Sequence, residues 1–295
     1  MMSRSFDKLP KDVISFSEES QISSFPSNGY IGDSSFLSTL KAIDTPPLFR
    51  YNKTMEQKKI RAIVTKENFF GESDKYISVF AKDEGKISLL CKGAKKQTSP
   101  FLAITDPFIY GDFIYEKSKR NNYLKSVDVI ESFPKIREDI LKLAYANFFA
   151  ELINRSFAEN VAGNDVMLLL LRCLKFMNSS QNHPSSTACV FILKFLKYMG
   201  YMPELYHCCV CGSDSVEDVY TPYGLVCKKH SHSGVLLPER SGDFLRYILE
   251  NNTPAVLKTN FKESLQLEKA LLLSLRTHIG EEMVSYKFIE KVDMR

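Results

Sequence analysis

The chain has no run of residues that is long and apolar enough to span a bilayer. Its most apolar stretch, VMLLLLRCLKF, is interrupted by Arg172 and soon afterwards by Lys175, whereas a membrane-spanning helix needs about 20 consecutive apolar residues. The first residues also lack the apolar segment of a secretory signal peptide. We therefore expect a soluble cytoplasmic protein that has no membrane partner.

The sequence also lacks the short motifs of several enzyme classes. It contains no H-E-x-x-H for a catalytic zinc, no G-x-S-x-G around a nucleophilic serine and no complete G-x-x-x-x-G-K-[ST] phosphate loop. The deaminase pattern of H-x-E with P-C-x-x-C is absent as well. A zinc hydrolase is therefore the weakest hypothesis, and we expect no catalytic residues and no enzyme activity.

The seven cysteines do not form the pattern of a disulfide framework, because their number is odd. Three of them, Cys91, Cys173 and Cys189, lie in apolar runs and are predicted to be buried, reduced thiols. The other four are concentrated in the segment HCCVCGSDSVEDVYTPYGLVCKKHSH, residues 207–232. This clustering is typical of metal ligands.

Two short pairs within that segment have the spacing of a zinc ribbon. Cys208 and Cys211 form a C-x2-C pair, and Cys227 and His230 form a C-x2-H pair fifteen residues later. Together they supply the four nitrogen and sulfur ligands of a closed tetrahedral site. We predict that these residues bind a structural Zn2+, and the alternative is a metal-free loop that contains thiols.

Three further donors lie in the same segment. Cys209 falls inside the first pair and is expected to point away from the metal, while His207 or His232 could take the place of His230. Gly212 follows the first pair, where the turn often needs a residue with positive φ.

Sequence patterning divides the chain into three parts. Residues 1–54 are rich in serine without a sustained period and predict a disordered leader, and Met55 is an alternative start. Residues 55–132 contain about five strand-like segments separated by turn residues, which fits a small sandwich or barrel. Residues 133–295 change to a period of 3.6 and predict a helical domain into which the cysteine segment is inserted. The fold class is α+β.

The first helical segment is SFPKIREDILKLAYANFFAELINR. Ser132 and Pro134 are good residues for a helix start, so one helix is predicted from there. Its apolar stripe includes Ile136, Ile140 and Leu143.

Positive charge is concentrated in the β-rich part. Residues 56–127 hold 14 Lys+Arg and 9 Asp+Glu, whereas the remainder of the chain sums to about zero. In CKGAKKQTSP, three lysines surround Gly93, which would let the backbone approach a phosphate. A basic module suggests a polyanionic partner, although a solvated lysine-rich surface explains the charge alone more readily. The basic residues assigned to nucleic-acid binding are Lys66, Lys75, Lys86, Lys92, Lys95, Lys96, Lys117, Lys119 and Arg120.

Aromatic residues are interleaved with these cations, as in barrels that bind single strands. Most of them are nevertheless expected in the core, because aromatic residues of strands usually pack inward. They are Phe69, Phe70, Tyr76, Tyr110, Tyr115 and Tyr123.

The order of these parts resembles the RecO family of recombination mediators. GESDKYISVFAKDEGKISLLCKGAKK is similar to the family's opening, with its G-E-x-D turn and its basic G-A-[RK]-[RK] end. ESFPKIREDILKLAYANFFAELINR resembles the first helix of the C-terminal domain, and LKYMGYMPELYHCCVCG with GLVCKKH resembles the zinc-bearing insert. The likeness runs from about residue 59 to 292. The last ligand is usually Cys in the family and is His230 here, but imidazole is a good zinc ligand.

The resemblance implies an N-terminal OB-fold barrel followed by a mostly helical domain with an inserted zinc ribbon-like element. It implies a DNA repair and recombination mediator of the RecFOR pathway in the bacterial cytoplasm or nucleoid. Such a protein binds single- and double-stranded DNA, anneals strands and helps to load RecA onto strands coated by single-stranded-DNA-binding protein. The implied partners are RecR and the C-terminal tail of that coating protein, and the implied DNA contacts are Lys92, Lys95 and Lys96.

The acidic tail of the coating protein would need an apolar pocket with cations at its rim. Two helical segments have this composition, and their candidate cations are Arg172, Lys175, Lys194 and Lys197. The same cations also fit the solvated faces of core helices. For the whole chain, an RNA-binding OB-fold and zinc protein linked to translation or RNA processing is the alternative, because a barrel and a ribbon do not identify the nucleic acid.

Overall fold

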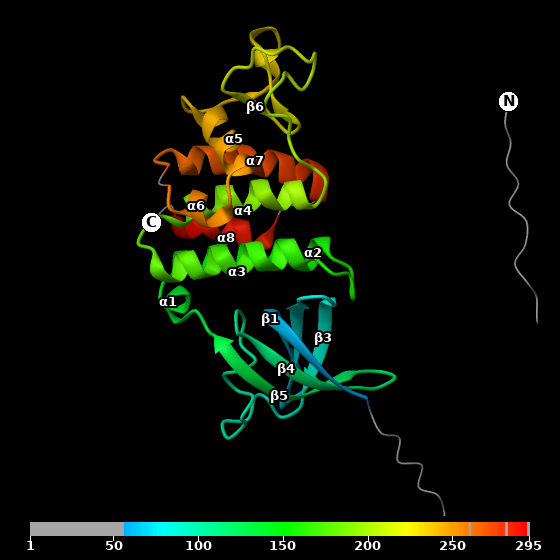
Figure 1. The fold of residues 1–295 in the computed structure, drawn as a ribbon. Helices are drawn as coiled ribbons and strands as arrows, with labels where there is room; N and C mark the ends of the chain where they lie inside the picture. The colour runs from blue at the N-terminus through cyan, green and yellow to red at the C-terminus, as the bar shows by residue number, and fades with distance from the viewer. Residues whose placement is uncertain (1–55, 260, 281–282, 294–295) are drawn as a thin grey trace, which may run out of the picture. The chain divides into compact units, whose positions relative to one another are not determined.

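Five strands form the first part of the chain that the structure describes. This computed structural model describes residues 56–259, 261–280 and 283–293, and the predicted leader lies outside them (Figure 1). β1 pairs with β2 and β4, β2 with β3, and β4 with β5, all antiparallel, while one parallel contact between Leu90 and Tyr123 joins β3 to β5. The sheet therefore closes in the order β1-β2-β3-β5-β4. The strands are β1 (Glu56–Phe70), β2 (Asp74–Ala81), β3 (Gly85–Cys91), β4 (Tyr110–Lys117) and β5 (Asn122–Glu131).

The two-residue period of β2 places its side chains in two different cores. Ile77 and Val79 are buried inside the closed sheet, together with Phe113 from β4. Phe80 has the opposite orientation and is buried in the core that the helices build. Because successive side chains of a strand point to opposite faces, both faces of β2 are covered at this end.

Eight helices are assigned among the described residues, and α4 lies at the centre of their packing. Every residue of α4 from Pro184 to Leu196 is buried, and the helix contacts α2, α3, α5, α6 and α7. A helix that is apolar on nearly all sides needs such a buried position. The helices are α1 (Pro134–Arg137), α2 (Ile140–Ser156), α3 (Asn164–Ser179), α4 (Pro184–Tyr198), α5 (Ser241–Glu250), α6 (Thr253–Leu257), α7 (Ser264–Ile279) and α8 (Val284–Asp293).

The single helix predicted from Ser132 is wrong, because the segment is divided into α1 and α2. Asp139 has an extended backbone, and its carboxylate accepts hydrogen bonds from the N–H groups of Leu141 and Lys142. It therefore caps a new helix. Ile140 stands at the first position of α2 and is 59% exposed, so it does not belong to the apolar stripe as predicted.

The sheet and the helices share side-chain contacts. Ile63, Phe80 and Phe108 come from the β-rich part, but they are buried in the helical core. Thr65 Oγ1 donates to Asn154 Oδ1 over 2.9 Å, and the Asn154 amide donates back to the Thr65 carbonyl over 3.3 Å. These contacts join β1 to α2.

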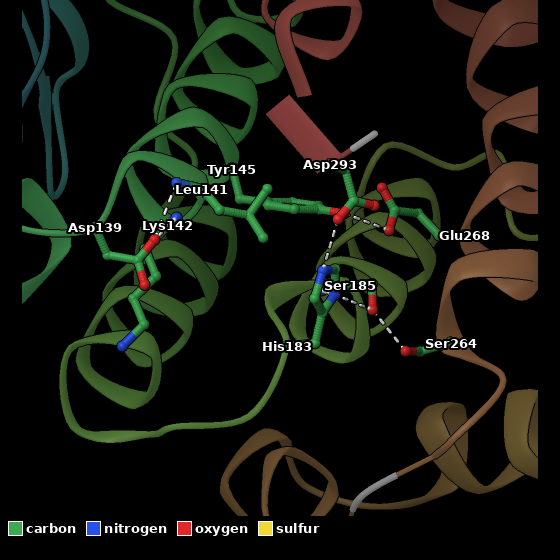
Figure 2. Close-up of polar contacts among 9 residues, drawn as sticks. All are labelled: Asp139, Leu141, Lys142, Tyr145, His183, Ser185, Ser264, Glu268 and Asp293. Carbon is green, nitrogen blue, oxygen red and sulfur yellow. Dashed lines mark hydrogen bonds and ion pairs between the residues drawn. The ribbon is translucent and has the colours of Figure 1, made fainter. Parts of the chain in front are cut away.

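Polar side-chain contacts, some of them buried, link α2, α4, α7 and α8 (Figure 2). The Tyr145 hydroxyl donates to Glu268 Oε2 over 2.9 Å, and Glu268 is fully buried. His183 contacts Ser185 Oγ through Nδ1 and Asp293 Oδ1 through Nε2. Ser185 Oγ in turn contacts Ser264 Oγ. These contacts thus join α2 and α4 to α7 and α8, which come much later in the sequence.

The cysteine segment is inserted between α4 and α5. It contains a small sheet in the order β7-β6-β8, formed by β6 (Val219–Thr221), β7 (Gly224–Leu225) and β8 (Val235–Leu236), and a 3-10 helix, η1 (Lys228–Ser233). None of the helices in the described residues has the length and apolarity needed to cross a membrane.

Candidate metal centre and basic surface

The insert brings the four predicted metal ligands together. The ligand atoms of Cys208, Cys211, Cys227 and His230 all lie within 4.8 Å of one another. Cys208 and Cys211 belong to one tight turn, which is closed by a hydrogen bond from the Gly212 N–H to the Cys208 carbonyl. Gly212 has a φ of 73°, as the sequence predicted for this turn. A similar bond from the His230 N–H to the Cys227 carbonyl closes the second turn.

The spacing of these atoms fits a tetrahedral ion. Zinc holds sulfur at about 2.3 Å and nitrogen at about 2.0–2.1 Å, so tetrahedral ligand atoms lie about 3.5–3.8 Å apart. The Cys211 and Cys227 sulfurs are 3.7 Å apart, and His230 Nδ1 lies 3.6 Å from Cys208 Sγ and 3.3 Å from Cys227 Sγ. The cluster can therefore hold a metal ion.

Electrostatics favour a metal-binding thiolate at Cys208. Burial opposes ionisation of its thiol, but the surrounding backbone N–H groups of Cys227, Cys211 and Val210 outweigh burial and lower the pKa to about 5. Thiolates are the form of cysteine that binds metals. Cys208 thus favours the protonation state that a metal needs, whereas the contacts of Cys211 with the Cys208 and Cys227 thiols raise the pKa of Cys211.

The other donors of the segment lie outside this cluster. Cys209 Sγ contacts Thr221 Oγ1 at 3.3 Å, so it points away from the ligands as predicted. His207 lies beside Glu204 and Asp214, and His232 is exposed in η1. The structure therefore places His230, not these two residues, with the three cysteines.

The other three cysteines are free and buried, as predicted from their apolar surroundings. Burial raises the pKa of the Cys91 thiol to about 12 and also raises the pKa of Cys173 and Cys189. These thiols therefore stay protonated and have no geometry for metal binding.

At the barrel, the basic loop after β3 is tied to the β1–β2 turn. Asp74 Oδ1 accepts from the Gly93 N–H over 2.7 Å, and the Lys95 N–H donates to the Ser73 carbonyl over 2.9 Å. Lys95 Nζ also donates to the Gly71 carbonyl. The prediction that Gly93 offers its backbone to a phosphate needs correction, because its N–H already has a carboxylate partner.

The predicted nucleic-acid contacts fall into exposed and engaged residues. Lys75 is buried and paired with Glu67 at 2.9 Å and Asp106 at 3.5 Å, so its assignment to the binding surface is corrected. Lys86 donates to the Asn154 carbonyl of α2 over 2.9 Å and thereby links the barrel to the helices. Lys95 is half-buried. The exposed cations are Lys66, Lys92, Lys96, Lys117, Lys119 and Arg120.

Two of the six aromatic side chains lie outside the core in which most of them were expected. Phe69 and Phe70 end β1 and are 68% and 52% exposed, whereas Tyr115 is buried and Tyr76 and Tyr123 are half-buried. Burying a phenylalanine side chain stabilises a fold by about 1.5–3 kcal/mol. Because Phe69 and Phe70 are exposed, they do not contribute this stabilisation in full. Alternation does not distinguish an exposed strand end from a covered one, so no pattern in the sequence indicated their exposure.

The four cations predicted for a partner peptide do not form one exposed rim. Lys194 is buried in α4 and its ammonium donates to the Asn251 carbonyl over 2.7 Å, so its role is internal and the prediction is corrected. Its burial lowers its pKa. Arg172 is half-buried, while Lys175 and Lys197 are exposed on α3 and α4.

Comparison with known proteins gives the family. Two family models match consecutive parts of the chain, the recombination protein O N-terminal model over residues 55–133 and the C-terminal model over residues 137–287. The chain belongs to the RecO family. The resemblance inferred from the motifs is thereby confirmed, and the chain has a role in DNA repair and recombination.

Several bacterial members of the family, each named DNA repair protein RecO, align with the chain. The protein of Acetivibrio thermocellus is 30% identical over 247 residues, which cover 81% of this chain and 98% of the relative. The protein of an Exiguobacterium species is 32% identical over 197 residues, which cover 66% of this chain and 78% of the relative. The Bacillus subtilis protein is 34% identical over 155 residues, which cover 52% of this chain and 60% of the relative.

Proposed function

We propose that this chain is a non-enzymatic mediator of recombinational repair. It binds single- and double-stranded DNA, anneals complementary strands and helps to load a recombinase onto strands coated by single-stranded-DNA-binding protein. The observation that carries this proposal is the match of both family models in order, with the N-terminal model lying over a β-rich part that displays a basic loop. The basic loop supplies the cations that phosphate binding requires.

The β-rich part serves as an OB fold in this proposal. Five strands that close in the order β1-β2-β3-β5-β4 support the assignment, since the OB fold is a five-stranded Greek-key barrel that binds oligonucleotides. Exposed Lys92 and Lys96 extend from the loop that is tied to the β1–β2 turn, so the phosphate contacts are held on a rigid element.

The insert serves as a zinc ribbon-like element with a structural Zn2+. The fit of the Cys3His cluster to tetrahedral distances supports this assignment. Four protein ligands would complete the coordination sphere, and a closed site of this kind stabilises the fold without catalysis.

The proposed protein partners are RecR and the acidic C-terminal tail of the coating protein. The tail would use the helical domain, where Lys175 and Lys197 remain candidate rim cations because they are exposed. Binding of a labelled tail peptide, measured by fluorescence anisotropy for the parent and for a Lys175→Glu/Lys197→Glu variant, tests this part of the proposal. Equal affinities of the two proteins would place the tail elsewhere.

A strand-annealing assay tests the central function. Complementary oligonucleotides, as DNA or RNA, are mixed with the protein with and without the coating protein, and duplex formation is followed by fluorescence. Faster annealing of coated DNA is the expected result. No acceleration of DNA annealing, or acceleration of RNA alone, would contradict the proposal.

A charge-matched pair of variants locates the phosphate contacts. Lys92→Ala/Lys96→Ala is expected to weaken DNA binding alike on all sequences and to reduce the slope of log affinity against log salt by roughly 1.4–1.8. Lys258→Ala/Lys262→Ala removes the same charge from exposed positions near α6 and α7 and should leave that slope unchanged. Similar effects of the two variants would show that net charge, and not this loop, governs binding.

A further inference from the structure

The end of the β1–β2 hairpin displays two planar apolar rings to solvent. Phe69 and Phe70 are adjacent and more than half exposed, and they lie where β1 meets the turn that begins at Gly71. Neighbouring residues of a strand point to opposite faces, so the two rings flank the hairpin on both sides. Large apolar residues that gather at an exposed position mark interaction sites.

Each ring is held in place by a neighbour. Lys95 Nζ lies 5.1 Å from the centre of the Phe69 ring and Lys75 Nζ lies 5.8 Å from it. Phe70 contacts Tyr76 edge to face, with ring centres 5.0 Å apart. Because Lys95 also bonds to the Gly71 carbonyl, the rings and the basic loop form one rigid unit. A rigid surface loses little conformational entropy on binding.

A polar cavity continues from the Phe70 side. The Tyr76 hydroxyl donates to Asn121 Oδ1 over 3.0 Å, and both residues line a cavity of about 340 Å3. Ser118 and Arg120 line it as well. This volume is at the lower end of the range of about 300–1,000 Å3 for small-molecule sites. Its hydroxyl, amide and guanidinium groups, together with the Glu159 carboxylate, are of the kinds that hydrogen-bond to the edges of nucleobases.

The charges around the rings select the occupant. Lys92 and Lys96 are exposed on the same loop as Lys95, and Lys92 Nζ lies 4.8 Å from the centre of the Tyr123 ring. Aromatic rings beside a line of cations suit a ligand that combines flat bases with a regular series of anions. Paired bases inside a duplex keep their faces covered, so the rings can stack only on unpaired bases.

We propose that Phe69 and Phe70 each offer a base-stacking surface for unpaired nucleotides, one on each side of the hairpin, with the cavity beside Tyr76 accepting the base next to the one stacked on Phe70. This inference rests on the proposed DNA-binding function and names the part of the surface that distinguishes single strands from duplex. The lysines supply affinity for any phosphate backbone, and the rings add a contact that depends on exposed bases and not on salt.

The test compares Phe69→Ala/Phe70→Ala with the parent on a single strand and on a blunt duplex of the same sequence. The expected result is single-strand affinity lower by about tenfold or more, duplex affinity changed less than twofold and an unchanged salt slope. Phe288→Ala, which removes a ring that is 46% exposed on α8, is the matched control and should bind like the parent. Equal thermal stability of the three proteins shows that folding is preserved.

A fluorescence readout tests stacking directly. A single strand that contains 2-aminopurine is expected to be quenched on binding to the parent and to Phe288→Ala. Phe69→Leu/Phe70→Leu keeps apolar side chains but has no rings, and it should lose the quenching at saturating protein. Quenching retained in the Leu variant, or equal loss of single-strand and duplex affinity in the Ala variant, would overturn the inference.

Two other outcomes are separable from these. If the parent binds neither single strand nor duplex, the proposed function itself fails. If an acidic peptide ending in apolar residues displaces the strand from the parent and loses affinity in the Ala variant, the hairpin is a peptide site and the stacking proposal is wrong.

Discussion

Glu268 is a carboxylic acid in the centre of the helical core. It is fully buried on α7, and its Oε2 accepts from the Tyr145 hydroxyl (Figure 2). Burial raises the pKa of this carboxyl to about 8, compared with about 4.3 for an exposed glutamate. The folded protein therefore prefers the protonated form, and its stability falls as the pH rises between these two values.

Glu268→Gln is expected to remove this pH dependence, because an amide cannot ionise. Relative to the parent, the variant should gain roughly 1.4 kcal/mol of unfolding free energy per pH unit between pH 5 and 8, with no further gain above pH 8. Denaturant unfolding at several pH values measures the difference. Glu290→Gln, which changes an exposed site on α8, is the control. Its unfolding free energy should change with pH in the same way as that of the parent. A constant difference between Glu268→Gln and the parent would show that Glu268 does not titrate in this range.

Cys211→Ser should abolish metal binding, whereas Cys209→Ser should preserve it. Cys211 belongs to the four-ligand cluster, while Cys209 contacts Thr221 instead. Metal analysis is expected to find about one zinc per chain in the parent and in Cys209→Ser. A chelator should lower the thermal stability of these two proteins only, because metal-binding energy contributes to folding energy. Zinc retained by Cys211→Ser would contradict the ligand assignment.

At the scale of elements, the β1–β2 turn and the loop after β3 act as one unit. Asp74 holds the Gly93 N–H, and Lys95 bonds to the turn through both its N–H and its ammonium. The G-E-S-D turn and the G-A-K-K loop are therefore structurally dependent on each other. This contact explains how two short motifs far apart in the sequence present one basic surface.

Asp74→Ala is expected to loosen this unit and to weaken DNA binding, although it removes a negative charge from a basic surface. The loss of a hydrogen bond to a charged group costs about 1.5–3 kcal/mol of stability. Glu72→Ala removes the same charge from an exposed position in the turn and should leave affinity equal or slightly higher. Anisotropy with labelled DNA and thermal unfolding measure both effects. Identical affinities of the two variants for DNA would show that the affinity depends on net charge and not on the hydrogen bond between Gly93 and Asp74.

For the molecule as a whole, the barrel and the helices are expected to unfold together, because residues of the β-rich part are buried in the helical core. Phe113→Ala opens a cavity inside the barrel and should cost about 3–5 kcal/mol. Hydrogen exchange measured by mass spectrometry should show faster exchange in both strands and helices. Ile140→Ala, at an exposed position, should change little. If the helices keep their parent exchange rates in Phe113→Ala, the two parts are independent.

Local sequence determined those features that depend on short spacings. The Cys208–Cys211 and Cys227–His230 pairs each occupy one turn, so their spacing predicted the four ligands that the structure brings together, while the choice of His230 over His207 or His232 needed the structure. Alternation predicted about five strands, and five strands close the sheet. The change of period likewise indicated the helices. In each case the physical cause acts within a few residues of the chain.

Tertiary structure alone decided which side chains remain available. Lys75 and Lys194 were indistinguishable from surface lysines in sequence, yet both are buried and bonded. Most of the aromatic residues of the strands were expected in the core, yet Phe69 and Phe70 are exposed. The Gly93 N–H is not free, because it donates to the carboxylate of Asp74, nineteen residues earlier. The burial of a side chain depends on which distant segment packs over it. Residue type and periodicity do not identify that segment, so only the packing of the fold decided which of these side chains are exposed.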